Sequence, residues 1–447
     1  VASYTVYFNL NNPEHEIAKI TPDEIQIMKN GGNEDGIILD GSRKMKPLRF
    51  LPDADLEEAD RLLVDLLVGN MTCPQGDRFL ILSWLSCFLL IDFAGTRPMT
   101  RFEGSAGSGK TTASKITSTL LYGEPQHKKA TDAANYTDGS QNPLIVLDNI
   151  EVKQMTEDLT TFMLTSITGI AKEKRKSGTD SETITERTKC LLNTTGIEPL
   201  CGELSEILSR SFVINFDLAN QASDCFLESE VISAIQQNRD LIISAIMKRT
   251  SHVLAMIRDG AQKQVMRLLH RTMPTHGKRR CNDYLSLMYL MMLAGSEEHE
   301  VTTGLEDLSP LFIEQIHSIN DTSQEMARES NPIATALASL FHAYRNAVEL
   351  DEKARYGEDD RANHVVGFIE RYQVRFENEN TMEPVSAGRL LAALRRVGRE
   401  FNLEFEYKKP AQLGRRISND LDVIRDAGFD IDRQRNAHTK NFEYWIS

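Results

Sequence analysis

The sequence predicts an α/β domain, then a helical segment, then a small module of helices and strands. From Arg78 to Cys201, apolar helical stretches alternate with short apolar strands. From about Ser229 to Ala294, nearly every stretch has the apolar spacing of a helix. The end of the chain predicts two helices and two strands. We therefore expect an N-terminal β/α region (1–75), an α/β core (76–228), a helical lid (229–325), a helical linker (326–383) and a C-terminal module (384–447).

The composition is typical of a globular chain of several domains. The 447 residues are 40% hydrophobic and 26% charged, and this length predicts roughly three domains. No apolar run reaches the roughly 18 to 20 residues that span a bilayer. The longest candidate, Phe79 to Gly95, is shorter and contains polar residues. We expect it to form a buried helix, and we expect no membrane partner.

The cysteines and the net charge limit the class of protein further. The six cysteines are widely spread and form no C-x-x-C pair, which favours neither a zinc site nor a secreted disulfide framework. We therefore expect a reduced, cytoplasmic chain. The net charge of −14 argues against a basic coat, but phosphate binding depends on local patches. The first residue is Val1, so the chain can be a piece of a longer protein.

The N-terminal region predicts strands followed by a helix. The stretch SYTVYFNL (residues 3–10) alternates apolar and polar residues, and GIILDG (residues 36–41) is a short apolar run. A helix follows, with Asp53 or Asp55 as its N-cap, acids in its first turn and an end at Gly69-Asn70.

A glycine-rich loop follows the next predicted strand. Gly104, Gly109, Lys110 and Thr111 fit G-x-x-x-x-G-K-[ST], with the strand MTRFE before them and a helix ending at Gly123 after them. Such a loop turns backbone N–H groups toward phosphates at a helix N-terminus. Its lysine places a positive charge on the phosphates, and its threonine hydroxyl ligates Mg²⁺. The predicted nucleotide-binding residues are Gly104, Ser105, Ala106, Gly107, Ser108, Gly109, Lys110, Thr111 and Thr112.

A buried strand is predicted to deliver Asp148 to the same edge of the sheet. PLIVLD is an apolar run that ends in an acid, and ligands of open α/β sheets gather where strands end. Asp148 is therefore a predicted Mg²⁺ ligand, although an ordinary turn aspartate gives the same pattern. Asn149 can orient an attacking water but cannot accept its proton. Glu151 and Glu103 stay open as alternative general bases.

Two further polar residues, Asn193 and Arg210, follow the glycine-rich loop and Asp148 in the sequence. TKCLLN predicts a strand that ends at Asn193, and EILSRSFVINFD places Arg210 just before another strand. The order of these motifs resembles the AAA+ ATPases. Asn193 matches the sensor-1 position of that family, and Leu-Ser-Arg-Ser-Phe resembles the arginine-finger motif of MCM-type helicases. The resemblance covers about residues 76–295.

This resemblance implies an ATP site between subunits. Lys110, Thr111 and Asp148 of one subunit would hold ATP and Mg²⁺, and Arg210 of the next would stabilise the transition state. A surface arginine beside a strand and a turn asparagine are the alternatives for Arg210 and Asn193. Arg249 and Arg258 are options for a second sensor, although solvated helix charges explain them more simply.

A hairpin is predicted between the strands of Asp148 and Asn193. Two strand-like flanks enclose the turn Ser177 to Asp180. It resembles the pre-sensor-1 hairpin of AAA+ helicases, which grips nucleic acid in a central channel. Its predicted phosphate contacts are Lys172, Lys174, Arg175 and Lys176. A solvated hairpin of mixed charge is the alternative, since acids share the segment.

The C-terminal module predicts helix, helix, strand, turn, strand. This order resembles the winged-helix domain at the C-terminus of MCM-like helicases. From Arg389 to Ser447 there are 12 Lys/Arg and 9 Asp/Glu, a net +3 within a chain of −14. The predicted DNA contacts are Arg415 and Arg416 on the second helix and Arg433, Arg435 and Lys440 on the wing. A winged helix that binds protein is the alternative.

Together these features predict an α/β P-loop AAA+ core with a helical lid, a small β-containing N-terminal region and a C-terminal winged-helix domain. The function that this resemblance implies is an ATP-driven, ring-forming DNA helicase, hexameric and replicative, similar to the MCM-like helicases of mobile genetic elements and to superfamily-3 helicases. The alternative is a DNA-bound initiator or regulatory ATPase that does not unwind. A small-molecule kinase is disfavoured because it needs no winged helix.

Overall fold

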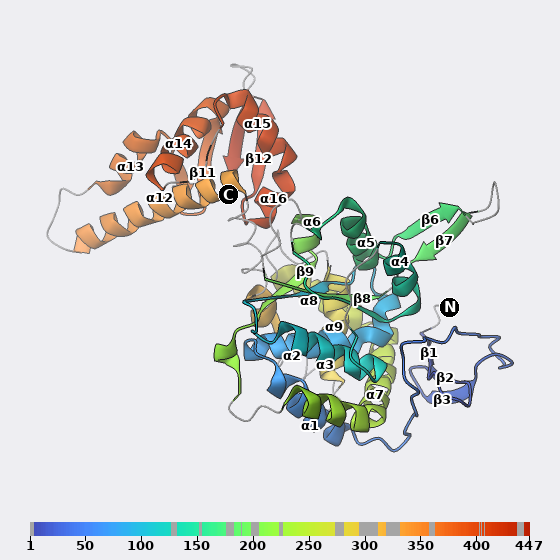
Figure 1. Ribbon diagram of the computed structural model, residues 1–447. Coiled ribbons are helices and arrows are strands. Elements are labelled where there is room, and N and C mark those ends of the chain that lie inside the picture. Colours follow the sequence, from blue (N-terminus) through green and yellow to red (C-terminus); the bar gives the residue numbers. More distant parts are fainter. Residues whose placement is uncertain are drawn as a thin grey trace. The chain divides into compact units, whose positions relative to one another are not determined.

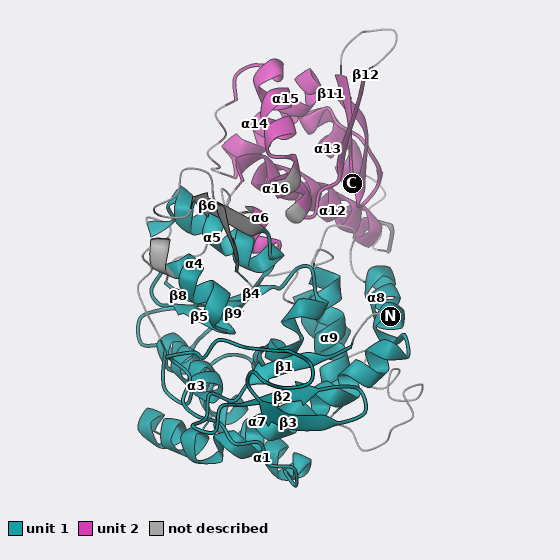
Figure 2. Ribbon diagram, turned by 90° about the vertical axis from the view of Figure 1, so that its right-hand side faces the viewer, with its two compact units in different colours: residues 1–199, 210–320 teal, residues 200–209, 321–447 magenta. Residues whose placement is uncertain are grey.

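The chain forms two compact units in the computed structural model (Figure 2). Unit 1 is Val1–Pro199 with Arg210–Asn320, and unit 2 is Leu200–Ser209 with Asp321–Ser447. The structure describes residues 4–126, 132–151, 154–175, 183–188, 190–197, 205–222, 227–272, 281–294, 312–318, 331–356, 363–401, 403, 405, 407–435 and 442–447.

Unit 1 is built on a parallel sheet of four strands in the order β5-β8-β4-β9, and the strands are labelled in Figure 2. The strands are β4 (Met99–Glu103), β5 (Leu144–Leu147), β8 (Leu191–Gly196) and β9 (Ser211–Asn215). Nearly all of their residues are buried, as expected for parallel strands covered on both faces. Because the strands are parallel, their carboxyl ends meet at one edge. The prediction of a mixed α/β core is confirmed.

Helices cover this sheet. The helix α3 (Lys110–Tyr122) follows β4 and ends, as predicted, at Gly123, whose φ of 78° is the left-handed conformation common after a helix. Also described are α4 (Asp132–Gln141) and α5 (Glu157–Thr168), between which β5 runs. The apolar stretch predicted as one buried helix forms two pieces, α2 (Gln75–Ser86) and the 3₁₀ helix η2 (Cys87–Phe93). None of the described helices has the length and apolar character needed to cross a membrane.

The predicted helical segment after the sheet is confirmed. It contains α7 (Glu228–Arg258), α8 (Ala261–Thr272) and α9 (Asn282–Leu293). The hairpin is confirmed as well, since β6 (Ala171–Arg175) pairs antiparallel with β7 (Thr183–Arg187) in a two-stranded sheet of its own. Figure 1 shows this hairpin reaching out beyond α4 and α5.

The N-terminal region forms an antiparallel sheet and a helix. The strands are β1 (Val6–Asn9), β2 (Glu16–Ile20) and β3 (Ile25–Lys29), and α1 (Leu56–Leu66) is capped by Asp55, which accepts from the N–H groups of Glu57 and Glu58. The strand expected at residues 36–41 is wrong. Side-chain amides satisfy this backbone instead, since Asn30 bonds both backbone groups of Leu39 and Asn33 bonds those of Ile37.

This region shares one hydrophobic core with α3, α7 and α9. Arg239 of α7 links this helix to α3 and to the N-terminal region. Its buried guanidinium donates to the carbonyls of Leu120 and Leu121 at the end of α3, and to those of Lys46 and Pro47. Burial lowers the pKa of Arg239 to about 10, so it stays protonated at neutral pH. The four described cysteines, Cys73, Cys87, Cys190 and Cys281, are buried and form no disulfide with one another.

Unit 2 has an antiparallel sheet in the order β10-β11-β13-β12, covered by helices. The described elements, in chain order, are α6 (Ser205–Leu208), α12 (Pro332–Tyr356), α13 (His364–Tyr372), β10 (Phe376–Asn378), β11 (Thr381–Ser386), α14 (Ala387–Glu400), α15 (Pro410–Asn419), α16 (Leu421–Asp426), β12 (Ile431–Arg435) and β13 (Phe442–Ile446). The strand β13 pairs with both β11 and β12.

Unit 2 differs from the prediction in two respects. The segment expected as a linker supplies α12 and α13 to the same core as α14, through Leu337, Leu340 and Phe368. The expected second helix is broken at Asp420 into α15 and α16. The buried carboxylate of Asp420 pairs with Arg416 at 2.6 Å and accepts from the Asn331 amide, which ties the break to the start of α12.

Arg239→Met tests the join between α7 and α3. We expect unit 1 to lose about 3 kcal/mol of unfolding free energy, because four carbonyls lose a charged donor. Urea unfolding followed by Trp84 fluorescence in a Trp445→Phe background reports unit 1, since these are the two tryptophans. Arg258→Met, on the same helix but paired with Asp23 at the surface, should leave the midpoint near that of the parent. Equal shifts for both variants would contradict this role.

Candidate functional site

The loop between β4 and α3 has the backbone of a phosphate cradle. Gly104, Gly107 and Gly109 have φ values of 146°, 81° and 97°, which only glycine adopts readily. A Cβ on Gly104 would lie 2.3 Å from the Phe216 carbonyl oxygen, and one on Gly109 would lie 2.5 Å from the Thr72 hydroxyl. Gly104 and Gly109 are thus required because a side chain would not fit there, as well as because of their backbone conformation. The N-cap of α3 is Gly109, which has no side chain to satisfy the first N–H groups of the helix.

Lys110 is the first residue of α3 and lies inside this loop. It is 8% exposed, and its ammonium donates to the carbonyls of Gly104 at 2.6 Å and Ser105 at 2.7 Å, and to the Ser108 hydroxyl at 3.2 Å. Burial lowers the pKa of Lys110, while the nearby carboxylate of Glu151 opposes this shift. The loop itself therefore holds the positive charge of the Lys110 ammonium at the start of α3.

Asp148 lies where β5 ends and joins three segments. Its Oδ1 accepts from the Thr111 hydroxyl at 3.1 Å and from the Thr195 hydroxyl at 2.7 Å. The Thr195 hydroxyl also accepts from the Asn149 N–H at 2.8 Å. The sequence-predicted residues Thr111 and Asp148 are thus brought together at the carboxyl edge of the sheet, as an oxygen pair that Mg²⁺ can bind.

Thr195 was missed by sequence reasoning, which placed the end of this strand at Asn193. That boundary is wrong, because β8 continues to Gly196. Asn193 is fully buried in mid-strand, where its amide donates to the Thr100 hydroxyl at 2.9 Å and accepts from the Ser114 hydroxyl at 2.7 Å. The local sequence offers only the polar run Asn-Thr-Thr as a sign that a side chain here contacts Asp148. The pairing register of β8 with β5 is needed to identify Thr195 as that residue.

Asn149 has the left-handed backbone that follows the strand. Its φ is 58°, a conformation that asparagine adopts more readily than most residues, and its side chain is exposed. Unusual backbone of this kind is frequent at functional sites. Here it turns the chain directly after Asp148.

A buried ion pair lies beneath the loop. Arg101 of β4 is 0% exposed, and its Nε lies 3.2 Å from Oε1 of Glu103, which is 4% exposed. The same guanidinium donates to the carbonyls of Ile150 at 2.8 Å and Thr195 at 2.9 Å. It therefore fixes the chain after β5 and the end of β8 together. Of the two acids considered as bases, Glu103 is held by Arg101, whereas Glu151 is more accessible and accepts from the Ile197 N–H.

Arg210 lies at the opposite edge of the sheet from Lys110. Its carbonyl accepts from the Met99 N–H, and the next residue, Ser211, pairs with Met99 at the start of β4. The five residues of β4 then separate this edge from the loop, a span of roughly 13 Å at about 3.3 Å per residue. The structure does not bring Arg210 and the loop of the same chain together.

Other predicted residues have structural partners. Thr112 donates to Glu228 at 2.5 Å, and Lys115 pairs with the same carboxylate, which ties α7 to α3. Arg249 pairs with Asp60 of α1, and Arg258 pairs with Asp23 at 2.9 Å. Both options for a second sensor thus contact the N-terminal region.

The predicted DNA contacts are only partly described. Lys172, Lys174 and Arg175 lie on β6, whereas Lys176 and Lys440 lie outside the described residues. On unit 2, Arg415 is exposed on α15 and Arg416 pairs with Asp420. The guanidinium of Arg433 lies 4.5 Å from the ring centroid of Phe442 and donates to Ser418.

The site has what a nucleoside triphosphate with Mg²⁺ requires. The loop offers backbone N–H groups at an uncapped helix start, a buried lysine, and the oxygens of Thr111 and Asp148. Within the described ranges, no cluster of three or more His, Cys, Asp or Glu could hold a metal by itself. A cation here would therefore need phosphate and water ligands as well, which is how Mg²⁺ is usually bound beside nucleotides.

Comparisons with known proteins leave the family open. No protein-family model matches the chain, and no curated protein matches its sequence. Among solved structures it is similar to "SCCmec type IV Cch - active helicase", at 12% identity and a TM-score of 0.48, covering 98% of this chain and 78% of that one. It is also similar to the "NrS-1 C terminal region", at 12% identity and a TM-score of 0.37, covering 96% and 93%. With TM-scores below 0.5, the function rests on the site itself.

Thr195→Val tests the link between β8 and Asp148. The change keeps the shape but removes the donor that orients the carboxylate, so we expect Mg²⁺-dependent binding of a fluorescent nucleoside triphosphate to weaken about ten- to hundredfold. Thr194→Val is the matched control. The Thr194 hydroxyl is buried and has no partner among the described residues, so its loss should change the affinity by less than about twofold. Similar losses in both variants would contradict the assignment.

Proposed function

We propose that this chain is an ATP-hydrolysing AAA+ motor that forms a ring, hexameric and replicative, and translocates on DNA as a helicase. The observation that carries this proposal is the separation of two cationic groups. Lys110 lies at the carboxyl edge of the sheet beside Thr111 and Asp148, and Arg210 lies at the amino edge of the same sheet. An arginine needed at the phosphates must then come from a second copy of the chain.

In this proposal the ATP phosphates lie in the loop from Gly104 to Thr112. Lys110 leaves the carbonyls of Gly104 and Ser105 to bind them, and Thr111 and Asp148 hold Mg²⁺. When bound there, the ion would supply positive charge to offset that of the phosphates. Thr195 orients Asp148, and Arg101 keeps the ends of β5 and β8 in place. Asn193 acts through Ser114 of α3 as a positioning residue, not as a group that touches phosphate.

The attacking water also needs groups to orient it and accept its proton. Asn149 is exposed directly after Asp148 and can orient a water molecule. Glu151 is the better placed of the two acids to accept the proton, because Glu103 is engaged by Arg101 in a buried pair. Glu151 also raises the pKa of Lys110 against the effect of burial, so it lies within electrostatic range of the phosphate site.

DNA would contact the hairpin and unit 2. Lys172, Lys174 and Arg175 of β6 would follow the phosphate backbone, together with Lys176. In unit 2, the order β11, α14, α15–α16, β12, β13, with β11 and β12 both paired to β13, supports a winged helix. Arg415 and Arg416 would then face the major groove, and Arg433, Arg435 and Lys440 would lie on the wing.

Mixing two inactive variants tests the shared site. Lys110→Ala loses the loop lysine, and Arg210→Ala loses the proposed neighbour group, so each should hydrolyse ATP at least about a thousandfold more slowly than the parent. A mixture should recover part of the activity, because some interfaces then combine an intact Lys110 with an intact Arg210. The readouts are steady-state ATP hydrolysis, native mass with and without ATP, and unwinding of a forked duplex.

The outcomes separate the candidate functions. Recovery on mixing together with unwinding supports the motor. Recovery without unwinding by the parent indicates the alternative, a DNA-bound initiator or regulatory ATPase. Full activity of Arg210→Ala under assembling conditions overturns the shared site. Arg258→Ala, an exposed arginine of the same unit, is the control and should hydrolyse ATP at the parental rate.

A further inference from the structure

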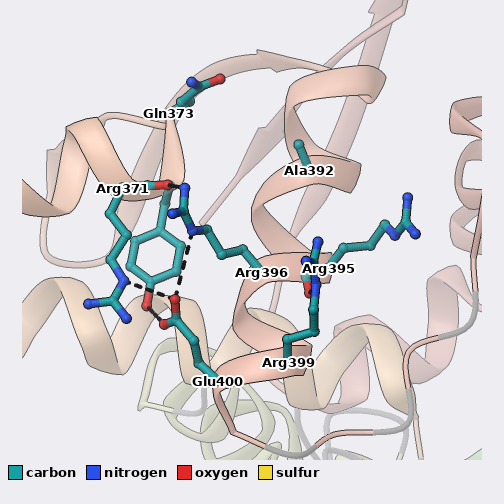
Figure 3. A pocket seen from close by; sticks show the side chains of 8 residues that line it. Arg371, Gln373, Ala392, Arg395, Arg396, Arg399 and Glu400 are labelled. Carbon is teal, nitrogen blue, oxygen red and sulfur yellow. Dashed lines mark hydrogen bonds and ion pairs between the residues drawn. The ribbon is translucent and has the colours of Figure 1, made fainter.

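Unit 2 carries an arginine-rich pocket where the end of α13 meets the exposed face of α14 (Figure 3). Its volume is about 460 Å³. Four of its lining residues are arginines, Arg371, Arg395, Arg396 and Arg399, and the one acidic lining residue is Glu400, which gives a net charge of +3. This concentration of positive charge stands out in a chain with a net charge of −14.

The pattern of α14 produces the pocket. Leu390, Leu394 and Val397 are buried on one face of the helix, in the core of unit 2. Arg395, Arg396 and Arg399 are therefore left on the opposite, exposed face, within one turn of each other. Like charges four residues apart, as at Arg395 and Arg399, destabilise a helix.

Glu400 organises two of the arginines. Its Oε1 lies 2.9 Å from Nε of Arg371 and 3.8 Å from Nε of Arg396, and its Oε2 accepts from the Tyr372 hydroxyl. Arg396 also donates to the Arg371 carbonyl at 2.5 Å. Figure 3 shows Arg371 and Arg396 gathered at this carboxylate. One negative charge thus holds two guanidinium groups in fixed positions.

The other two arginines have no such partner. In the part of the chain that the structure describes, neither Arg395 nor Arg399 lies within ion-pair distance of a carboxylate; Arg399 donates to the Arg395 carbonyl at 3.4 Å. Both side chains are exposed. The pocket therefore presents two uncompensated guanidinium groups beside two that are already fixed.

We propose that this pocket binds the phosphate backbone of DNA, as a contact separate from α15 and the wing. This inference rests on the proposed function for the identity of the polymer. Guanidinium groups bind phosphate oxygens through paired N–H donors, and all four cations here are arginines. The aromatic ring that lines the pocket, Tyr372, is buried and its hydroxyl is engaged, so it offers no face on which a base can stack. The contact is therefore to phosphate and does not read sequence.

The double variant Arg395→Gln/Arg399→Gln tests the pocket in the full chain. We measure its binding to a labelled duplex and to a single strand of equal length over a range of salt concentrations. Affinity at about 0.1 M salt should fall at least about tenfold, and the slope of log K against log salt should become shallower by about two, because each missing arginine leaves one phosphate unbound. In a Trp84→Phe background, Trp445 fluorescence during unfolding confirms that unit 2 is intact.

Two further variants make the test specific. Arg389→Gln removes the same charge from the first turn of α14, outside the pocket, and should change the affinity by no more than about twofold. Arg395→Lys/Arg399→Lys keeps the charge without the paired donors and should fall between the parent and the glutamine variant. The single variant Arg399→Gln is measured beside Arg389→Gln, and equal losses of affinity in these two overturn the pocket, because they indicate a general effect of charge.

The remaining outcomes separate this inference from the motor. DNA affinity within about twofold of the parent in the double variant overturns the pocket alone, whether or not the parent unwinds a fork. If the double variant loses DNA binding while the parent hydrolyses ATP but never unwinds a fork, the pocket is supported and the proposal of a helicase is overturned. Loss of binding to a poly-glutamate probe, with DNA binding unchanged, assigns the arginines to an acidic protein and overturns the proposal.

Discussion

The carboxylate of Asp148 is the acceptor on which the arrangement of unit 1 depends. It receives the hydroxyl of Thr111 from α3 and the hydroxyl of Thr195 from β8, while its own strand is β5. Three segments that are distant in sequence therefore meet at one oxygen atom. A parallel sheet brings the ends of its strands to one edge, but it does not fix side chains there. The two hydrogen bonds do so.

Buried polar groups elsewhere in unit 1 support that edge. Arg101 spans from Glu103 to the carbonyls of Ile150 and Thr195, and Asn193 joins Thr100 of β4 to Ser114 of α3. Unpaired, each of these groups would be costly in a core of this density, so the set is stable only when complete. The same groups that stabilise the sheet also orient the loop and the carboxylate. Protein groups thus orient the site, and among the described residues no cluster of His, Cys, Asp or Glu could hold a metal by itself.

Local patterns predicted those features that depend on neighbouring residues. The glycine loop, its strand and helix, the strand before Asp148, the hairpin and a cap at Asp53 or Asp55 all follow from short-range spacing. Thr195 was missed because its partner, Asp148, lies just after another strand, 47 residues away, and the choice among Asn193, Thr194 and Thr195 depends on register. The expected strand at residues 36–41 failed for a different, local reason, since the side-chain amides of Asn30 and Asn33, nine and four residues before their partners, occupy its backbone groups.

The two units also show what a sequence pattern leaves out. The helices α12 and α13 look like a linker until their apolar faces are seen in the core of unit 2. The break at Asp420 depends on Asn331, a residue 89 positions away. Arginines on α14 are recognisable from sequence as an exposed face, but the pocket requires the end of α13, which supplies Arg371.

Calorimetric titration of ATP into the parent chain and into Asp148→Asn, each with and without Mg²⁺, tests whether the Asp148 carboxylate holds the ion at a nucleotide site. Mg²⁺ should strengthen ATP binding to the parent at least about tenfold, whereas the variant should bind ATP but gain little from the ion, since it lacks the carboxylate ligand. An equal gain from Mg²⁺ in both proteins, or no ATP binding by the parent, would contradict this role of Asp148.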